Sequence, residues 1–262
     1  MAARAIWKGV LNLGKAHVPV RFYSAVEDRD VHFRLLHAKD KEPVTQQMVN
    51  PETGKPVPPE NIRKGFEVDP GVFVLLDADE LASLEPEPSR DVEVKLFVAP
   101  RGIAPQLYER PYWLGPDGDQ NAYLALAQAL AAKQQHGIVS WTMRKKRYVG
   151  SLHSDGEHLM VVTLRFGDEV VLPAQLEAPA GPELRAAERR MAEQLVAALE
   201  GPFDPSEFHD EFRERVLDLV QRKARGGRVK RAPRPEPKRR EVSLESALEH
   251  SLRDVQKQRK TA

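Results

Sequence analysis

The sequence predicts an α+β protein in which a β-rich region precedes a helical region. Strand-like segments, with apolar residues at every second position and turn signals between them, occupy about the first two-thirds of the 262 residues. In the last third the apolar residues follow helical spacing instead. A chain of this length forms one large domain, or one domain with appendages, and is long enough to bury a sizeable core.

Five segments are predicted strands. The apolar alternation of a half-buried strand is clearest in residues 18–22 and 92–98, and the other three segments are residues 72–76, 138–143 and 159–166. Asp155-Gly156 supplies the positive φ angles of a tight turn, so we expect a hairpin that joins the last two strands.

Two short helices are predicted within the β-rich region. Asp77 can cap the first, because Glu80 follows three residues later as in a capping box. The second covers the alanine- and leucine-rich residues 122–135 and is expected to end at Gly137.

The C-terminal third contains two consecutive predicted helices. The first starts at Pro182 and ends at Gly201-Pro202, and its apolar positions are Leu184, Met191, Leu195 and Leu199. The second is capped by Asp204, with Pro205 at its first position, and stops at Gly226-Gly227. Its apolar stripe is Phe208, Phe212, Val216 and Leu219.

A third helix is predicted after Ser243, beyond a proline-containing basic segment. Its apolar stripe consists of Leu244, Leu248, Leu252 and Val255. This stripe has no local element to pack against, so it is either a frayed tail helix or a segment that binds in the groove of a partner.

Residues 38–65 differ from their surroundings. They are polar, contain several prolines and show little periodicity. The segment is about twice as long as an ordinary connection, and such segments are usually functional or disordered. We expect either disorder or an excursion that leaves the β-rich region.

The net charge of +1 is the sum of strongly acidic and strongly basic parts of the chain. Residues 221–240 hold ten basic residues and one acid, a net charge of +9, while residues 1–220 carry −8 and residues 241–262 are neutral. Residues 120–154 contain no acid and include Arg144, Lys145, Lys146 and Arg147. Dense blocks of one charge are typical of nucleic-acid contacts, although a solvated face or a disordered tail has the same composition.

Several classes of protein are excluded or disfavoured by composition. The absence of cysteine excludes disulfides, thiolate metal sites and cysteine nucleophiles, and it suits a reducing cytoplasm. The chain shows neither a membrane-spanning apolar run nor an export signal, so we expect a cytoplasmic protein without membrane contact. It also lacks a phosphate-binding glycine loop, a nucleophile elbow and a zinc motif, and we expect no cofactor and no metal.

One segment could carry chemistry. On a strand, Asp91, Glu93 and Lys95 would point to one face, an arrangement typical of Mg²⁺-dependent nucleases. Any solvated strand face has the same alternation, with Val92, Val94 and Leu96 then facing the core. The nuclease therefore stays an alternative, as does an RNA-binding structural protein.

Taken in order, a set of short motifs resembles the bacterial Ku proteins of non-homologous end joining. The resemblance covers roughly residues 5–227, and each motif is weak by itself, whereas their order and spacing are specific. The motifs are Ile6-Trp7-Lys8-Gly9, Val18-Pro19-Val20, Tyr23, Leu36-His37-Ala38-Lys39-Asp40, Lys64-Gly65-Phe66-Glu67, Phe97-Val98, Pro111-Tyr112-Trp113-Leu114, Asp168-Glu169, Phe203-Asp204-Pro205 and Phe208-His209-Asp210.

The resemblance implies a fold and a domain organisation. Residues 1–180 would form a β-barrel core with a projecting bridge at about residues 32–68. Residues 181–227 would form a helical arm, and residues 228–262 a basic tail with a short amphipathic helix.

The resemblance also implies a function without catalysis. Two subunits would form a ring that threads onto a double-stranded DNA end regardless of sequence. The C-terminal region would contact DNA and an ATP-dependent multidomain DNA ligase during double-strand break repair. We therefore expect a cytoplasmic, nucleoid-associated homodimer whose partners are DNA ends and that ligase.

The expected DNA contacts follow from this comparison. Sequence-independent binding needs cations that meet phosphates, and the candidates are Lys39, Lys41, Lys55, Arg63 and Lys64 in the bridge, Arg144, Lys145, Lys146 and Arg147 on an expected ring-lining strand, and Arg228, Lys230, Arg231, Lys238, Arg239 and Arg240 in the tail.

Three positions or segments depart from the family pattern. Some relatives have a Cys-x-x-Cys pair in the bridge, which residues 45–56 lack, so a metal-stabilised bridge is excluded here. Ser140 stands where many relatives have arginine, and Arg147 stands where many have an acid. The basic lining is thereby shifted.

Overall fold

The computed structural model describes residues 4–176 and 185–226. The chain divides into two compact units, of which the first comprises residues up to 29 together with residues 34–175. The second unit comprises residues 30–33, residue 176 and residues 185–226 of the described ranges. Within the described ranges, no helix is long and apolar enough to cross a membrane.

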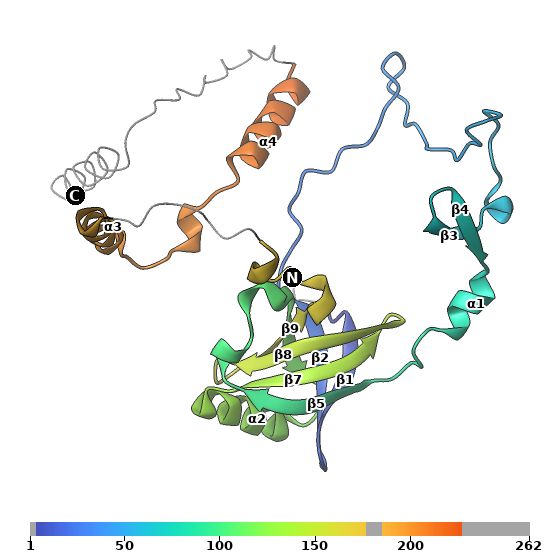
Figure 1. Ribbon diagram of the computed structural model, residues 1–262. Coiled ribbons are helices and arrows are strands. Elements are labelled where there is room, and N and C mark those ends of the chain that lie inside the picture. The colour runs from blue at the N-terminus through green and yellow to red at the C-terminus, as the bar shows by residue number, and fades with distance from the viewer. Residues whose placement is uncertain (1–3, 177–184, 227–262) are drawn as a thin grey trace. The chain divides into compact units, whose positions relative to one another are not determined.

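The first unit is built on a closed seven-stranded barrel with the strand order β1-β2-β6-β9-β8-β7-β5 (Figure 1). Its strands are β1 (Trp7–Leu13), β2 (Ala16–Ser24), β5 (Asp91–Val98), β6 (Tyr108–Pro116), β7 (His136–Met143), β8 (Lys146–Ser154) and β9 (Leu159–Leu164). All neighbours are antiparallel except β1 and β5, whose parallel pairing closes the barrel. The predicted α+β class with a β-barrel core is confirmed.

The barrel strands correct two sequence predictions. Strands β1, β6 and β8 were not predicted, and the Asp155-Gly156 turn joins β8 to β9 rather than residues 138–143 to β9. The register of β5 shifts between Val94 and Leu96, a β-bulge that ends the two-residue alternation. Leu96 is consequently 51% exposed, and the prediction that it faces the core is wrong.

The core fills the barrel with inward-facing residues from every strand. In β2, the alternating residues Val18, Val20 and Phe22 are all buried, which is the period of two that the sequence predicted. Phe22 lies at the centre of an aromatic group, with ring centroids 4.9 Å from Trp7 and 5.9 Å from Trp141. Burial of such large side chains is the main stabilising contribution to the fold.

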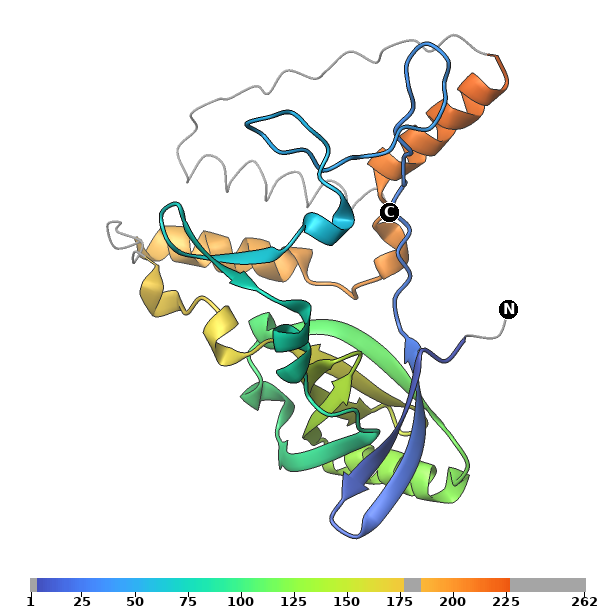
Figure 2. The same cartoon turned by 90° about the vertical axis from the view of Figure 1, so that its right-hand side faces the viewer.

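Helix α2 (Gln120–Lys133) lies across one end of the barrel (Figures 1 and 2). It is capped by Asp119 and buries Tyr123, Ala127 and Leu130. Its last turn ends at Gln134, which adopts the left-handed conformation with φ 50°. The predicted end at Gly137 is therefore wrong, because Gly137 already belongs to β7.

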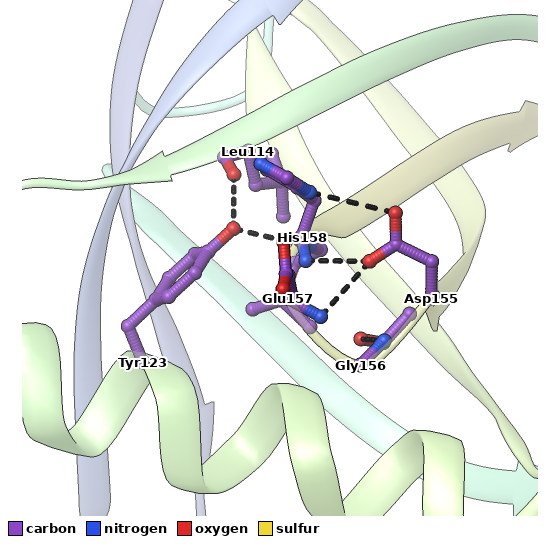
Figure 3. Close-up of polar contacts among 8 residues, drawn as sticks. Leu114, Tyr123, Asp155, Gly156, Glu157 and His158 are labelled. Atoms are coloured by element: carbon purple, nitrogen blue, oxygen red, sulfur yellow. Dashed lines mark hydrogen bonds and ion pairs between the residues drawn. The ribbon is translucent and has the colours of Figure 1, made fainter.

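The hydroxyl of Tyr123 attaches α2 to the barrel (Figure 3). It donates to the Leu114 carbonyl of β6 and accepts the Leu159 N–H of β9 at 2.8 Å. Burial raises the pKa of this phenol above its ordinary value, which already keeps a tyrosine protonated at neutral pH. Beside it, the Asp155 carboxylate accepts the N–H groups of Glu157 and His158 and stabilises the β8–β9 turn.

The chain leaves the barrel after β2 and returns to it at β5 (Figure 1). Between them, isolated bridges at Leu36–Pro43 and Val49–Pro56 close two successive turns. A 3-10 turn, Pro59–Asn61, precedes an antiparallel hairpin of β3 (Lys64–Asp69) and β4 (Val72–Leu76), and helix α1 (Ala78–Ser83) follows. The backbone N–H of Asp77 donates to Glu80, so the predicted start of α1 is confirmed.

The second unit contains helices α3 (Ala186–Leu199) and α4 (Glu211–Ala224). Asp204 caps only a 3-10 turn, Pro205–Glu207, and the cap of α4 is Asp210, whose carboxylate accepts the Arg213 N–H at 3.0 Å. The predicted start of this helix is thus about six residues too early. Pro182, Leu184 and the helix predicted after Ser243 lie outside the described residues.

Candidate nucleic-acid interface

Three candidate cations lie on the turns that follow β2. Lys39 and Lys41 belong to the turn closed by the Leu36–Pro43 bridge, and Lys41 has a positive φ of 63°. Lys55 belongs to the second turn, where its carbonyl accepts the Asn50 N–H. All three lysines are exposed, and none of them forms an ion pair with a carboxylate of the described residues. They are available to an anionic partner.

Arg63 is held locally, unlike these lysines. Its guanidinium donates to the carbonyl of Glu60 at 2.6 Å and lies 3.7 Å from the Asp77 carboxylate. Lys64 follows as the first residue of β3 and is exposed. Arg63 therefore has a structural role at the base of the hairpin in addition to its charge.

The acid-free block of residues 144–147 forms a hairpin end rather than a continuous strand, which corrects the expected ring-lining strand. Arg144 and Lys145 form the two-residue turn between β7 and β8, and Lys146 and Arg147 begin β8. Both turn residues have positive φ, 50° and 66°. Two-residue hairpin turns need such angles at both positions, for which Asn-Gly is the usual sequence.

This turn is strained by its own sequence. A side chain in the left-handed region costs about 1–2 kcal/mol per residue, and only glycine, asparagine and aspartate adopt it readily. Strain of this kind persists mostly where function requires a particular side chain. The structure thus places two cations at the position of a hairpin where the fold would favour Asn-Gly.

An acidic segment lies beside the cationic turn. Nζ of Lys145 is 2.9 Å from a carboxylate oxygen of Glu85, which follows α1. Glu85, Glu87, Arg144 and Lys145 line a concavity of about 460 Å³ together with Trp7. Glu85 is 60 residues from Lys145 in sequence, so no local pattern could have indicated this pairing.

The next concavity, of about 280 Å³, is lined by residues that include Arg147, Ser140, Glu87, Asp91 and Glu93. Two of the three departures from the family pattern, Ser140 and Arg147, are therefore neighbours in space. Arg147 therefore supplies a cation to this concavity, where Ser140 replaces the arginine of many relatives.

The arrangement of Asp91 and Glu93 is that of a hydrogen-bonded strand face. The amide of Asn12 on β1 donates to both carboxylates, at 3.0 and 3.1 Å. Hydrogen bonds from Ser89 and Asn12 lower the pKa of Asp91. Lys95 lies in the β-bulge, which interrupts the alternation that would align it with them. In the described parts of the chain, no three His, Cys, Asp or Glu side chains gather as a metal-binding set.

Arg110 is a further cation of the barrel that no sequence pattern indicates. Its guanidinium lies 5.7 Å from the ring centroid of Tyr112, a cation–π contact on β6. Burial raises the pKa of Tyr112, and Arg110 and Arg144 are among the charges that act on its hydroxyl. Arg110 and Arg144 thus lie in the same part of the barrel.

The remaining candidates fall on residues outside the described ranges. They are the tail cations Arg228, Lys230, Arg231, Lys238, Arg239 and Arg240 and the predicted partner-binding residues Leu244, Leu248, Leu252 and Val255. Their roles stay predictions.

Comparison with known proteins agrees with this barrel. The family described as the Ku70/Ku80 beta-barrel domain matches residues 12–195. The chain is 36% identical to "Non-homologous end joining protein Ku 2" of Geotalea uraniireducens, with 97% of this chain and all of the relative aligned. It is 38% identical to the protein Ku of Anaeromyxobacter (95% and 85% aligned) and 33% identical to that of Mycobacterium tuberculosis (86% and 85% aligned). The closed barrel, the long excursion between β2 and β5 and these similarities together establish that the chain belongs to the Ku family.

Proposed function

We propose that this protein binds the ends of double-stranded DNA as a homodimer and recruits an ATP-dependent DNA ligase in non-homologous end joining. Its relatives carry the name of that process. The protein would act on DNA in the cytoplasm, at the nucleoid, as a binding protein and without catalysis of its own. No geometry of the described residues favours the nuclease alternative.

One observation carries the DNA-binding proposal most directly. The β7–β8 turn keeps Arg144 and Lys145 in left-handed backbone conformations that those residues disfavour. Contacts to phosphate require cations and no base-reading side chains. The exposed lysines of the turns after β2 supply further charge of the same kind without an obvious structural role.

The homodimer is supported by the exposed apolar residues of the β3–β4 hairpin. Phe66, Phe73 and Leu75 are 65%, 60% and 67% exposed. An isolated two-stranded hairpin is marginally stable in water, and large exposed apolar patches usually mark interfaces. A second copy would cover these side chains. We expect the double substitution Phe73→Ser/Leu75→Ser to increase the monomer fraction in sedimentation, while Leu84→Ser, which changes another exposed apolar residue, does not.

The test of end binding compares linear duplex DNA with closed-circular DNA of equal length. A protein that threads onto ends binds the linear form more tightly. Equal affinity for both forms would contradict threading. Competition with duplex RNA in the same assay separates this function from that of an RNA-binding structural protein, which would prefer the RNA.

Ligase recruitment and tail binding need a separate experiment. Deletion of residues 228–262 removes six of the candidate DNA contacts and the predicted partner-binding stripe. We expect weaker DNA binding or weaker stimulation of ligation, with the dimer intact. A monomeric truncated protein would contradict the assignment of dimerisation to the body of the protein.

A further inference from the structure

The cationic turn of β7–β8 is occupied in the structure by an acidic segment of the same unit. We define the acidic strap as residues 85–89, which connect α1 to β5 and contain Glu85, Pro86, Glu87, Pro88 and Ser89. Glu85 forms the ion pair with Lys145, and Glu87 shares one concavity with Arg144 and the next with Arg147. The strap thus places carboxylates where a phosphate backbone would approach these cations.

Both sides of this contact are held in place by the backbone. Pro86 and Pro88 fix their own φ angles and bias the residues before them, Glu85 and Glu87, towards extended conformations. The N–H of Glu85 also donates to the Ala82 carbonyl at the end of α1. On the other side, the two-residue turn fixes the backbone of Lys145, whereas its flexible four-carbon side chain remains free to rotate. The Glu85 carboxylate is therefore presented by a restricted segment, and the lysine is the mobile partner of the ion pair.

We propose that the acidic strap is a built-in competitor of DNA phosphate, and that Glu85 must release Lys145 before this lysine can contact DNA. The inference rests on the proposed DNA-binding function and deepens it. The side chain of Lys145 is 71% exposed and that of Glu85 is 35% exposed. The contact is accordingly open to solvent and can exchange one partner for the other.

The competition between Glu85 and DNA phosphate changes the salt dependence of DNA binding. A free lysine that meets phosphate releases about one cation from the DNA, which changes the slope of log Kobs against log salt by about −0.9. Added salt also screens the exposed Glu85–Lys145 ion pair, which weakens the competitor and opposes the loss of DNA affinity. Lys145 therefore adds little to the salt dependence as long as Glu85 is present.

The experiment measures affinity for a linear duplex as a function of salt in four full-length proteins: the wild type, Glu85→Gln, Lys145→Gln and the double variant. We expect Glu85→Gln to bind about two- to fivefold more tightly, the range expected when an exposed ion pair no longer competes. Its salt slope becomes steeper, by at most about 0.9. When Lys145→Gln is already present, adding Glu85→Gln should change neither the affinity nor the salt slope.

Glu87→Gln, alone and combined with Lys145→Gln, is the matched control. It removes one carboxylate from the same strap, but no ion pair joins Glu87 to Lys145 in the described structure. Its effect should be independent of Lys145. Equal coupling of Glu85 and Glu87 to Lys145 would mean that only the summed charge of the strap matters, and it would overturn the proposal.

DNA binding and the competition by Glu85 are tested by different outcomes. A wild-type protein that does not bind duplex DNA contradicts the proposed function. A wild-type protein that binds DNA, with Glu85→Gln unchanged in affinity and in salt slope, contradicts only the competition. Thermal unfolding of each variant provides a check that the barrel remains folded.

Discussion

The indole of Trp141 on β7 lies directly against Gly150 on β8. A Cβ atom at position 150 would fall 2.8 Å from Cζ3 of Trp141 and 2.9 Å from Cγ2 of Val161. Trp141 and Val161 are 2% and 0% exposed, so neither can move into solvent. Only glycine at position 150 leaves room for the indole inside the barrel.

Gly150→Ala should therefore destabilise the barrel. Overpacking of a tight core typically costs about 1–3 kcal/mol, and urea unfolding followed by tryptophan fluorescence would measure this. Gly167→Ala is the control, because nothing lies within 4 Å of a Cβ at that position. Equal stability of the two variants would contradict the packing described here.

The strained β7–β8 turn predicts a trade-off between stability and binding. The double substitution Arg144→Asn/Lys145→Gly installs the residues that such a turn favours. We expect the free energy of unfolding to rise by about 1–2 kcal/mol and DNA affinity to fall. Lys146→Gln/Arg147→Gln removes the same charge without relieving the turn and should not stabilise the protein. A double variant of the turn that is no more stable than the wild type would refute the strain.

Removal of the Tyr123 hydroxyl should weaken the attachment of α2. In Tyr123→Phe the Leu114 carbonyl and the Leu159 N–H lose their buried partner. An unsatisfied buried polar group costs about 1–3 kcal/mol. Hydrogen exchange should become faster in α2 and at Leu159. Tyr23→Phe, on β2, changes a less buried tyrosine and serves as control.

The histidines of β7 and β8 predict a pH dependence of stability. The rings of His136 and His153 stack with centroids 4.7 Å apart, and burial lowers the pKa of both. Nδ1 of His153 is buried and has no hydrogen-bond partner among the described residues. The folded protein therefore takes up protons at lower pH than the unfolded chain, whose histidines titrate near pH 6.5.

It follows that stability is fully present above about pH 6.5 and decreases as the pH falls below that value. Urea midpoints measured between pH 7.5 and 5.5 would check this. The double variant His136→Gln/His153→Gln should lose most of the dependence, whereas His209→Gln, in the second unit, should retain it. An unchanged slope in the double variant would assign the dependence to other groups.

Much of the fold follows from local patterns, and the exceptions have local causes. The alternation of Val18, Val20 and Phe22 is sufficient to predict β2. Strand β8 escapes prediction because its turn is Arg144-Lys145, which has no Asn or Gly, and because Gly150 replaces a large inward residue. Two aspartates that can both cap a helix, Asp204 and Asp210, make the start of α4 ambiguous in sequence.

The candidate site is less accessible to sequence reasoning. The cluster of basic residues 144–147 is recognisable in the sequence, but its division into a two-residue turn and the start of β8 is not. The pairing of Lys145 with Glu85 depends on the path of the chain from α1 into β5. Contacts between distant segments arise from the tertiary fold, and a single sequence contains no periodic signal for them.

The parallel pairing of Val10, Leu11 and Asn12 with Asp91, Val92 and Glu93 closes the barrel around a 66-residue excursion between Ser24 and Asp91. The entropy lost on closing a flexible loop grows only with the logarithm of its length, so doubling the excursion would cost roughly 0.6 kcal/mol. The barrel consequently tolerates insertions and deletions in this segment far better than in any of its strands. The length of the excursion can therefore change during evolution, to suit a binding partner of a different size, with little effect on the stability of the barrel.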